Sequence, residues 1–193
     1  MNFLQQIRSR IGHYLMDKGV ASLSRSKKLV NINSAVSVGI LFELTDDEVY
    51  YSVQKYFQKL QEKKIKVKVL GYVSNKLAVN KFLPVLSVDF FNEKQINWFY
   101  IPKAPCIQDF VETDFDICIN IASDSVFPLK YISALSKARL KVGAYGKDLP
   151  AQEYKELSSI YDIMMLSEET HNQITFLDNI HEYLTILNPK ENV

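Results

Sequence analysis

The chain has 193 residues, 47% of them hydrophobic and 23% charged, with only six glycines and six prolines. This composition predicts one well-buried core and excludes a low-complexity or disordered chain. Two cysteines, Cys106 and Cys118, are too few for a secreted domain held together by disulfides, so the sequence favours a reducing cytoplasm.

The sequence does not indicate membrane insertion or secretion. No apolar run approaches the roughly 18 to 20 residues of a membrane-spanning helix. Polar residues also interrupt the start of the chain before a signal-peptide core can form. We therefore expect a cytoplasmic protein.

Charge is unevenly distributed along the chain. Residues 1–35 contain six basic residues and one acidic residue, a net charge of +5, whereas the other 17 basic and 21 acidic residues give residues 36–193 a net charge of −4. We therefore divide the chain into a basic N-terminal leader, residues 1–35, and a single α/β domain, residues 36–193.

The leader is predicted to form an amphipathic helix. Its apolar stripe consists of Phe3, Leu4, Ile7, Ile11, Tyr14 and Leu15. Arg8, Arg10 and Lys18 lie outside that stripe. Such a helix can dock on its own domain, pair with a second copy, lie on an anionic membrane or touch nucleic acid. Its few basic residues carry no interleaved aromatic platform, which argues against nucleic acid.

Residues 36–44, VSVGILFEL, are a continuous apolar run rich in β-branched residues, which predicts a central strand covered on both faces. A helix should follow, because apolar residues then recur three and four positions apart. Thr45 and Glu48 predict a capping box at the start of that helix. Residues 65–73, IKVKVLGYV, predict a second strand parallel to the first.

The pattern is weaker from residue 74 to residue 114, where residues 85–91 predict a third strand. Residues 115–122, FDICINIA, restore a clear strand pattern, and Pro128 marks the first turn of the next helix. Asp116 is expected at the entrance of this strand, where it can cap or form a salt bridge, because a buried and unpaired carboxylate is costly.

The last third of the chain continues the alternation. Residues 140–146 and 161–166 predict two further strands, and apolar residues from Ile174 to Leu187 predict a C-terminal amphipathic helix. Strands that alternate with such helices indicate right-handed crossovers and a mostly parallel sheet of five to six strands. The predicted fold is a Rossmann-like three-layer α/β sandwich, whose ligands bind beyond the carboxyl ends of the strands.

The first strand-to-helix turn is acidic and lacks glycine. Residues 43–48, ELTDDE, carry four carboxylates, whereas phosphate-binding turns carry glycines that let backbone N–H groups approach the ligand. The acids can offset the helix dipole, or they can bind a cation or an amine. Glu43, Thr45 and Asp46 are the candidate ligand-binding residues of this turn.

Ser123, Asp124 and Ser125 occupy the second clear turn. Their side chains can cap the helix that follows, or they can point at a polar ligand. They are the remaining candidate ligand-binding residues.

The sequence lacks the motifs of several common enzymes. It contains no G-x-S-x-G elbow, no H-E-x-x-H motif and no paired-cysteine spacing. His13, His171 and His181 lie away from both turns in the sequence. We therefore predict no catalytic residue, no metal site and no cofactor.

Residues 96–105, INWFYIPKAP, bring three aromatic residues into a predicted loop. Such residues can cover one end of the core, or they can anchor a partner. The candidate partner-binding residues, from this loop and from the leader, are Trp98, Phe99, Tyr100, Phe3, Ile7, Arg8, Arg10 and Ile11.

Four stretches carry a resemblance to a known family: AVSVGILFE, KVKVLGYV, INWFYIPK, and FDICINIA with FPLKYISALSKARLKVGAY. Together they resemble a family of small uncharacterised proteins, a domain of unknown function found mainly in Bacteroidota, whose members tend to begin with a basic helical segment. That resemblance implies the fold and carries no established activity.

The order of strand, helix, VKVLGYV, FDICINIASDS, helix and ARLKVGAY is also similar, more distantly, to the N-terminal half of heptosyltransferase-like glycosyltransferases. That resemblance implies a glycine-containing first turn and a second Rossmann-like domain that binds a sugar nucleotide. This chain instead has Glu43 to Glu48 in the turn and too few residues for a second such domain.

These observations predict a non-catalytic cytoplasmic binding or scaffold protein that docks through its basic N-terminal helix. The partner is a protein, a second copy or, peripherally, the inner face of the membrane. The alternative is a small glycosyltransferase-like enzyme or ligand sensor that uses the turns at residues 43–48 and 123–125.

Overall fold

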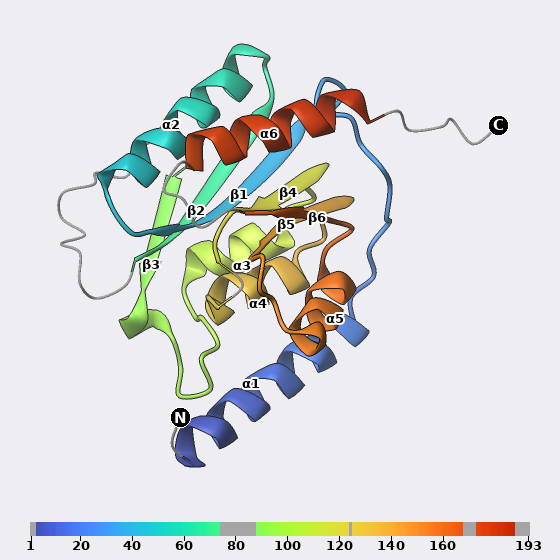
Figure 1. Ribbon diagram of the computed structural model, residues 1–193. Coiled ribbons are helices and arrows are strands. Elements are labelled where there is room, and N and C mark those ends of the chain that lie inside the picture. Colours follow the sequence, from blue (N-terminus) through green and yellow to red (C-terminus); the bar gives the residue numbers. More distant parts are fainter. Residues whose placement is uncertain (1–2, 74–87, 124, 168–172, 188–193) are drawn as a thin grey trace.

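Six parallel strands form one sheet in the computed structural model, which describes residues 3–73, 88–123, 125–167 and 173–187 (Figure 1). Across the sheet the strand order is β3, β2, β1, β4, β5, β6. The strands are β1 (Ser37–Leu44), β2 (Lys66–Val73), β3 (Val88–Asn92), β4 (Ile117–Asn120), β5 (Leu140–Tyr145) and β6 (Ile163–Leu166). The predicted Rossmann-like α/β fold is therefore confirmed.

β1 is the central strand predicted from its apolar run. It pairs with β2 on one side and β4 on the other, so that Val38 lies between Val67 and Ile117. Successive side chains of a strand point to opposite faces. Phe42 accordingly enters the core beneath one helical layer, and Leu41 enters the core beneath the other.

Helices cover both faces of the sheet (Figure 1). One layer consists of α2 (Asp47–Glu62) and α6 (Gln173–Ile186), and the other consists of α3 (Pro105–Glu112), α4 (Phe127–Leu135) and α5 (Ala151–Ile160). Leu177, Ile180 and Leu184 of α6 are buried, as the C-terminal apolar pattern predicts. The side chain of Ile174 and the whole of His171 lie outside the described residues.

The leader forms α1 (Phe3–Ala21), which lies outside the layer of α4 and α5 (Figure 1). Gly12 and Met16 are its buried residues. The segment after α1 then runs back to β1 along the domain: the Lys28 backbone N–H donates to the Arg139 carbonyl, and the Ile32 N–H donates to the Leu184 carbonyl.

The predicted cap of α2 is wrong, and two of the candidate caps of α4 do not cap that helix. The N-cap of α2 is Asp46, whose carboxylate accepts from the Val49 N–H at 2.9 Å, while the Thr45 hydroxyl donates to Asp46 instead of capping the helix. A carboxylate is the stronger acceptor at a helix start, because its charge also interacts favourably with the helix dipole. The N-cap of α4 is Val126, which makes no side-chain cap, so neither Ser123 nor Ser125 caps this helix.

The expectation for Asp116 is confirmed. Its Oδ2 accepts from the backbone N–H groups of Val36 and Ser37 at 2.8 and 3.1 Å, and its Oδ1 accepts from Arg139 at 3.1 Å. Asp116 lies just before β4, the strand next to β1. Its carboxylate therefore accepts hydrogen bonds from the backbone N–H groups at the start of β1. Pro128 also lies in the first turn of α4, as predicted. Of the predicted third strand, residues 88–91 belong to β3, and residues 85–87 lie outside the described part.

Candidate functional site

A cleft of about 830 Å³ opens at the carboxyl edge of the sheet. Four parts of the chain line it: α1, the ends of β1 and β2, the short helix η2 (Glu93–Gln95) with the loop that follows, and the turn into α4. The lining residues are Gln5, Arg8, Ser9, Glu43, Tyr72, Glu93, Ile96, Asn97, Tyr100, Ser125, Val126, Phe127 and Pro128.

The position of the cleft follows from the strand order. The chain builds outward from β1 to β2 and β3, and then returns to place β4 on the other side of β1. In open α/β sheets such a reversal separates the connections that follow the two neighbouring strands and leaves a crevice beyond their carboxyl ends. Glu43 near the end of β1 and Ser125 after β4 border this crevice.

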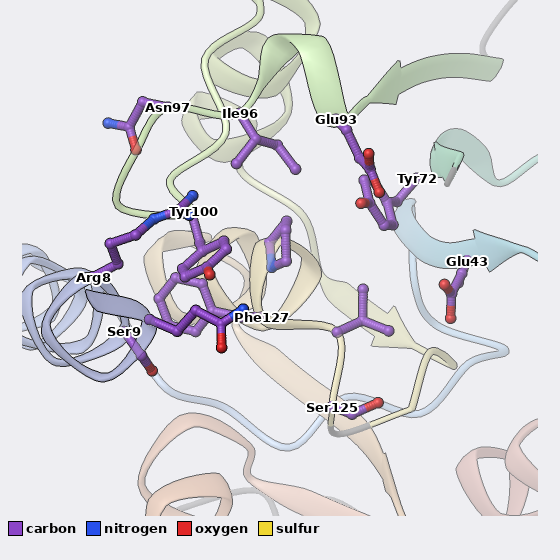
Figure 2. A pocket seen from close by; sticks show the side chains of 13 residues that line it. Arg8, Ser9, Glu43, Tyr72, Glu93, Ile96, Asn97, Tyr100, Ser125 and Phe127 are labelled. Atoms are coloured by element: carbon purple, nitrogen blue, oxygen red, sulfur yellow. The ribbon is translucent and has the colours of Figure 1, made fainter. Parts of the chain in front are cut away.

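Glu43, Tyr72 and Glu93 form one side of the cleft, which we call the acidic wall (Figure 2). Glu43 is half-buried, and the loss of hydration raises the pKa of its carboxyl group. Burial, followed by the charges of Glu93 and Glu43, also raises the pKa of the Tyr72 hydroxyl. This side of the cleft therefore carries two carboxylates, one half-buried at Glu43 and one exposed at Glu93.

Arg8 and Tyr100 lie on the opposite side, at α1 (Figure 2). The Arg8 guanidinium carbon is 4.4 Å from the Tyr100 ring centroid and 5.2 Å from the Trp98 ring centroid, and Arg8 Nε donates to the Trp98 carbonyl at 2.6 Å. These contacts are cation–π interactions combined with a charge-assisted hydrogen bond. They hold the loop of residues 96–105 against the leader.

Backbone N–H groups of the turn into α4 are already hydrogen-bonded to carbonyl groups of the same turn. The Val126 N–H donates to the Ser123 carbonyl, the Phe127 N–H to the Ser125 carbonyl, and the Leu129 N–H to the Val126 carbonyl. Pro128 has no N–H to offer. This helix start therefore lacks the row of available donors that binds phosphate in nucleotide-binding folds.

The predicted ligand-binding residues are only partly brought together. Glu43 and Ser125 both line the cleft. Thr45 and Asp46 lie in the turn before α2, bonded to each other, and do not line it. Ser123 is exposed and shares a hydrogen bond with Ser125 at 3.0 Å, and Asp124 lies outside the described residues.

The predicted partner-binding residues also divide into two groups. Arg8 and Tyr100 line the cleft, with Trp98 packed on Arg8, while the Phe99 carbonyl faces Gly12 of α1. The others lie on the outside of α1 or at its margin: Phe3, Ile7, Arg10 and Ile11. The leader and the aromatic loop were predicted as two separate candidate surfaces. In the structure they contact each other.

Sequence reasoning missed Tyr72, Glu93 and Asn97. Tyr72 could have been predicted, because it is the penultimate residue of a predicted strand, next to the edge where ligands bind. Glu93 and Asn97 follow β3, the strand with the weakest sequence pattern, and no spacing marks them.

The inner face of α1 packs closely on the domain. A Cβ atom at Gly12 would lie 2.5 Å from the Phe99 carbonyl oxygen, and one at Gly19 would lie 2.6 Å from a methyl carbon of Leu135. Between them, His13 Nε2 lies 3.4 Å from Glu156 of α5, which also pairs with Lys130 at 3.0 Å. The His13 hydrogen bond is the main cause that lowers the pKa of Glu156 to about 2.

The outer face of α1 exposes three residues of the apolar stripe, whereas Ile7, Ile11 and Leu15 of the stripe are partly buried. Phe3, Leu4 and Tyr14 are 75%, 60% and 65% exposed, whereas Met16 on the inner face is 1% exposed. At about 100° per residue, the centre of the apolar stripe lies about 110° around the helix from the packed glycines. None of the helices in the described ranges is long and apolar enough to cross a membrane.

Comparison with known proteins identifies a family. No curated protein matches the chain at a significant level. A model for a family of unknown function, DUF6913, matches residues 8–187, which include the sheet, its covering helices and most of α1. The chain therefore belongs to this family of unknown function.

Proposed function

We propose that this protein is a non-catalytic, cytoplasmic docking protein whose α1 helix binds an anionic membrane surface. The observation that carries the proposal is that α1 packs on its own domain through Gly12 and Met16, while Phe3, Leu4 and Tyr14 of its apolar stripe are exposed. A leader that served only to cover the core would turn its largest apolar side chains inward.

The non-catalytic part of the proposal is supported by the turns at the carboxyl edge. Asp46 is used as the cap of α2, and the backbone groups before α4 bond to one another. Both turns therefore already serve the local structure. A cytoplasmic location is supported by Cys106 and Cys118, which are both free thiols.

The membrane part is supported by the charges beside the stripe. Arg10 and Lys18 are exposed, and the leader as a whole carries a net charge of +5. A helix with Phe and Leu on one face and basic residues beside them binds at a lipid interface through buried apolar area and attraction to anionic lipids.

Charge also favours a lipid surface over a second copy of α1. If two such helices paired through their stripes, Arg10 and Lys18 of each would approach the basic residues of the other. Asp17 is the single acidic residue of the leader and cannot balance them. An anionic bilayer instead supplies the opposite charge along the whole stripe.

The full chain is expected to bind vesicles of phosphatidylcholine with phosphatidylglycerol and to bind vesicles of phosphatidylcholine alone more weakly. Arg10→Gln and Lys18→Gln should each weaken binding about fivefold, because a basic residue near an anionic surface contributes about 1 kcal/mol. Tyr14→Ser should also weaken binding, through lost apolar contact. Vesicle flotation with quantified protein measures each change.

Two variants on the opposite face serve as controls. Tyr51 on α2 is 62% exposed, and Lys55 on the same helix is also exposed, so Tyr51→Ser and Lys55→Gln should bind as the unmodified chain does. Equal binding to both vesicle types would contradict the proposal. A dimer in sedimentation experiments that is abolished by Tyr14→Ser would also contradict it and would identify a second copy as the occupant.

A further inference from the structure

The cleft at the carboxyl edge has the size and position of a ligand site that the docking role of α1 does not use. Its volume of about 830 Å³ falls within the range of small-molecule pockets in proteins. It also lies where the strand order reverses, which is where ligands of open α/β sheets bind.

The cleft does not favour an anion. The N–H groups of Val126, Phe127 and Leu129 donate to carbonyls of the same turn, and Pro128 has none. The Arg8 guanidinium, the nearest positive charge in the lining, is held by two aromatic rings and by the Trp98 carbonyl. A phosphate group would therefore meet no available donors at α4 and two carboxylates on the acidic wall.

The acidic wall favours a cation. No cationic side chain within the described ranges pairs with Glu43, which is half-buried and has lost part of its hydration. Tyr72 and Glu93 lie beside it on the same side of the cleft (Figure 2). A partly buried carboxylate without a counterion has lost favourable hydration, and a positively charged ligand group would compensate for that loss.

The rest of the lining favours an organic ligand over a bare metal ion. In the described residues no group of three or more His, Cys, Asp or Glu is placed to hold a metal. Facing the acidic wall across the cleft are the rings of Tyr100 and Phe127 (Figure 2). Aromatic rings bind flat or weakly polar groups by stacking and by excluding water.

We propose that the cleft binds a small organic amine, whose ammonium group pairs with Glu43 and Glu93 and whose flat body lies against Tyr100 and Phe127. Tyr72 completes the acidic wall, and its hydroxyl oxygen accepts a hydrogen bond from the ammonium group. This proposal is independent of the membrane role, because none of its five residues belongs to the exposed stripe of α1.

The first test uses the unmodified full chain and pairs of probes that differ only in the amine. Tyramine is compared with 4-ethylphenol, and benzylamine with benzyl alcohol, by thermal shift and then by calorimetric titration. The amine of at least one pair should raise the melting temperature, and its neutral counterpart should bind about tenfold more weakly, because hydrogen bonds to a charged group are the stronger class. Inorganic phosphate and AMP should give no shift.

The second test changes the acidic wall. Glu43→Gln keeps the size of the side chain and removes its charge, and it should weaken binding of the amine about tenfold. Glu48→Gln, five residues further on, removes a carboxylate that does not line the cleft and should leave binding unchanged. Glu93→Gln repeats the test from a different element if the first variant folds poorly.

Three outcomes would overturn the proposal. These are equal shifts from the members of each probe pair, a shift with phosphate or AMP alone, and the absence of a shift with any amine. Each can be read on the unmodified chain, so none depends on how a variant folds.

Discussion

Gly12→Leu is expected to destabilise the protein by about 2 kcal/mol and to release α1 from α4, because overpacking a tight contact costs about 1 to 3 kcal/mol. A Cβ atom at this position would lie 2.5 Å from the Phe99 backbone oxygen and 3.2 Å from the Phe127 ring. The backbone oxygen cannot move aside as a flexible side chain could. The improved helix propensity of leucine, about 0.8 kcal/mol, offsets part of the cost.

Gly12→Leu should lower the free energy of unfolding of the whole protein and should also loosen α1 itself. Urea unfolding measures the loss of stability, and hydrogen exchange of residues 3–21 measures the release of α1. Gly146→Leu is the matched control, because no atom lies within 4 Å of the Cβ position there. If Gly12→Leu leaves exchange in α1 unchanged, the close packing of this helix on α4 is contradicted.

Acidification is expected to destabilise the native state through His181 of α6, which is buried against α2. Burial, followed by the charges of Lys59 and Lys63, lowers the pKa of His181 from 6.5 to about 4, and Asp178 opposes this shift. The unfolded chain therefore binds a proton at a higher pH than the native state does. Stability is lost as the pH falls from 6.5 towards about 4.

The size of this effect follows from the difference between the two pKa values, and is on the order of 2 to 3 kcal/mol. Urea unfolding over the same pH range measures it. His181→Gln should flatten the loss, since glutamine can keep a hydrogen bond to the Tyr56 hydroxyl, which lies 3.3 Å from His181 Nδ1.

His13 provides a control with the opposite sign. The hydrogen bond to Glu156 raises the pKa of His13, so its contribution is present below 6.5 and is lost as the pH rises through the raised value. His13→Gln should therefore abolish a gain in stability that occurs as the pH falls through the raised value to 6.5, and it should leave the loss between 6.5 and about 4 unchanged. If His13→Gln flattens the loss between pH 6.5 and about 4 as His181→Gln does, the linkage assigned to these two residues is wrong.

The sheet could be predicted from the sequence because its central strands are nearly continuous apolar runs. VSVGILFEL and KVKVLGYV became β1 and β2 with parallel pairing along their whole length. The helix caps could not be predicted in the same way. Whether Thr45 or Asp46 caps α2 depends on where β1 ends, and a shift of one residue changes the answer.

The hydropathy pattern of α1 did not predict which face of this helix packs on the domain. The apolar stripe marks one side of the helix, but the domain contacts the side that carries Gly12, Met16 and Gly19. Glycines seven residues apart fall on one face of a helix and allow another backbone to approach closely. The seven-residue spacing of the two glycines could therefore have indicated the packed face, whereas hydrophobic periodicity could not.

The cleft could be predicted only in part. Glu43 and Ser125 follow from the rule that ligands lie beyond the carboxyl ends of parallel strands. Arg8 and Tyr100 could not be placed there, because they meet only when the leader folds back over the domain. The acidic wall likewise joins residues from three separate elements.

The most direct test of the account compares thiol labelling at two positions of α1, read peptide by peptide because Cys106 is partly exposed. A Tyr14→Cys variant should react quickly in solution and become protected when anionic vesicles are added. A Met16→Cys variant should react slowly in both conditions, since this position is 1% exposed. Equal rates at the two positions, or faster labelling of the Met16→Cys variant, would contradict the claim that α1 packs inward through its small residues and presents its apolar stripe outward.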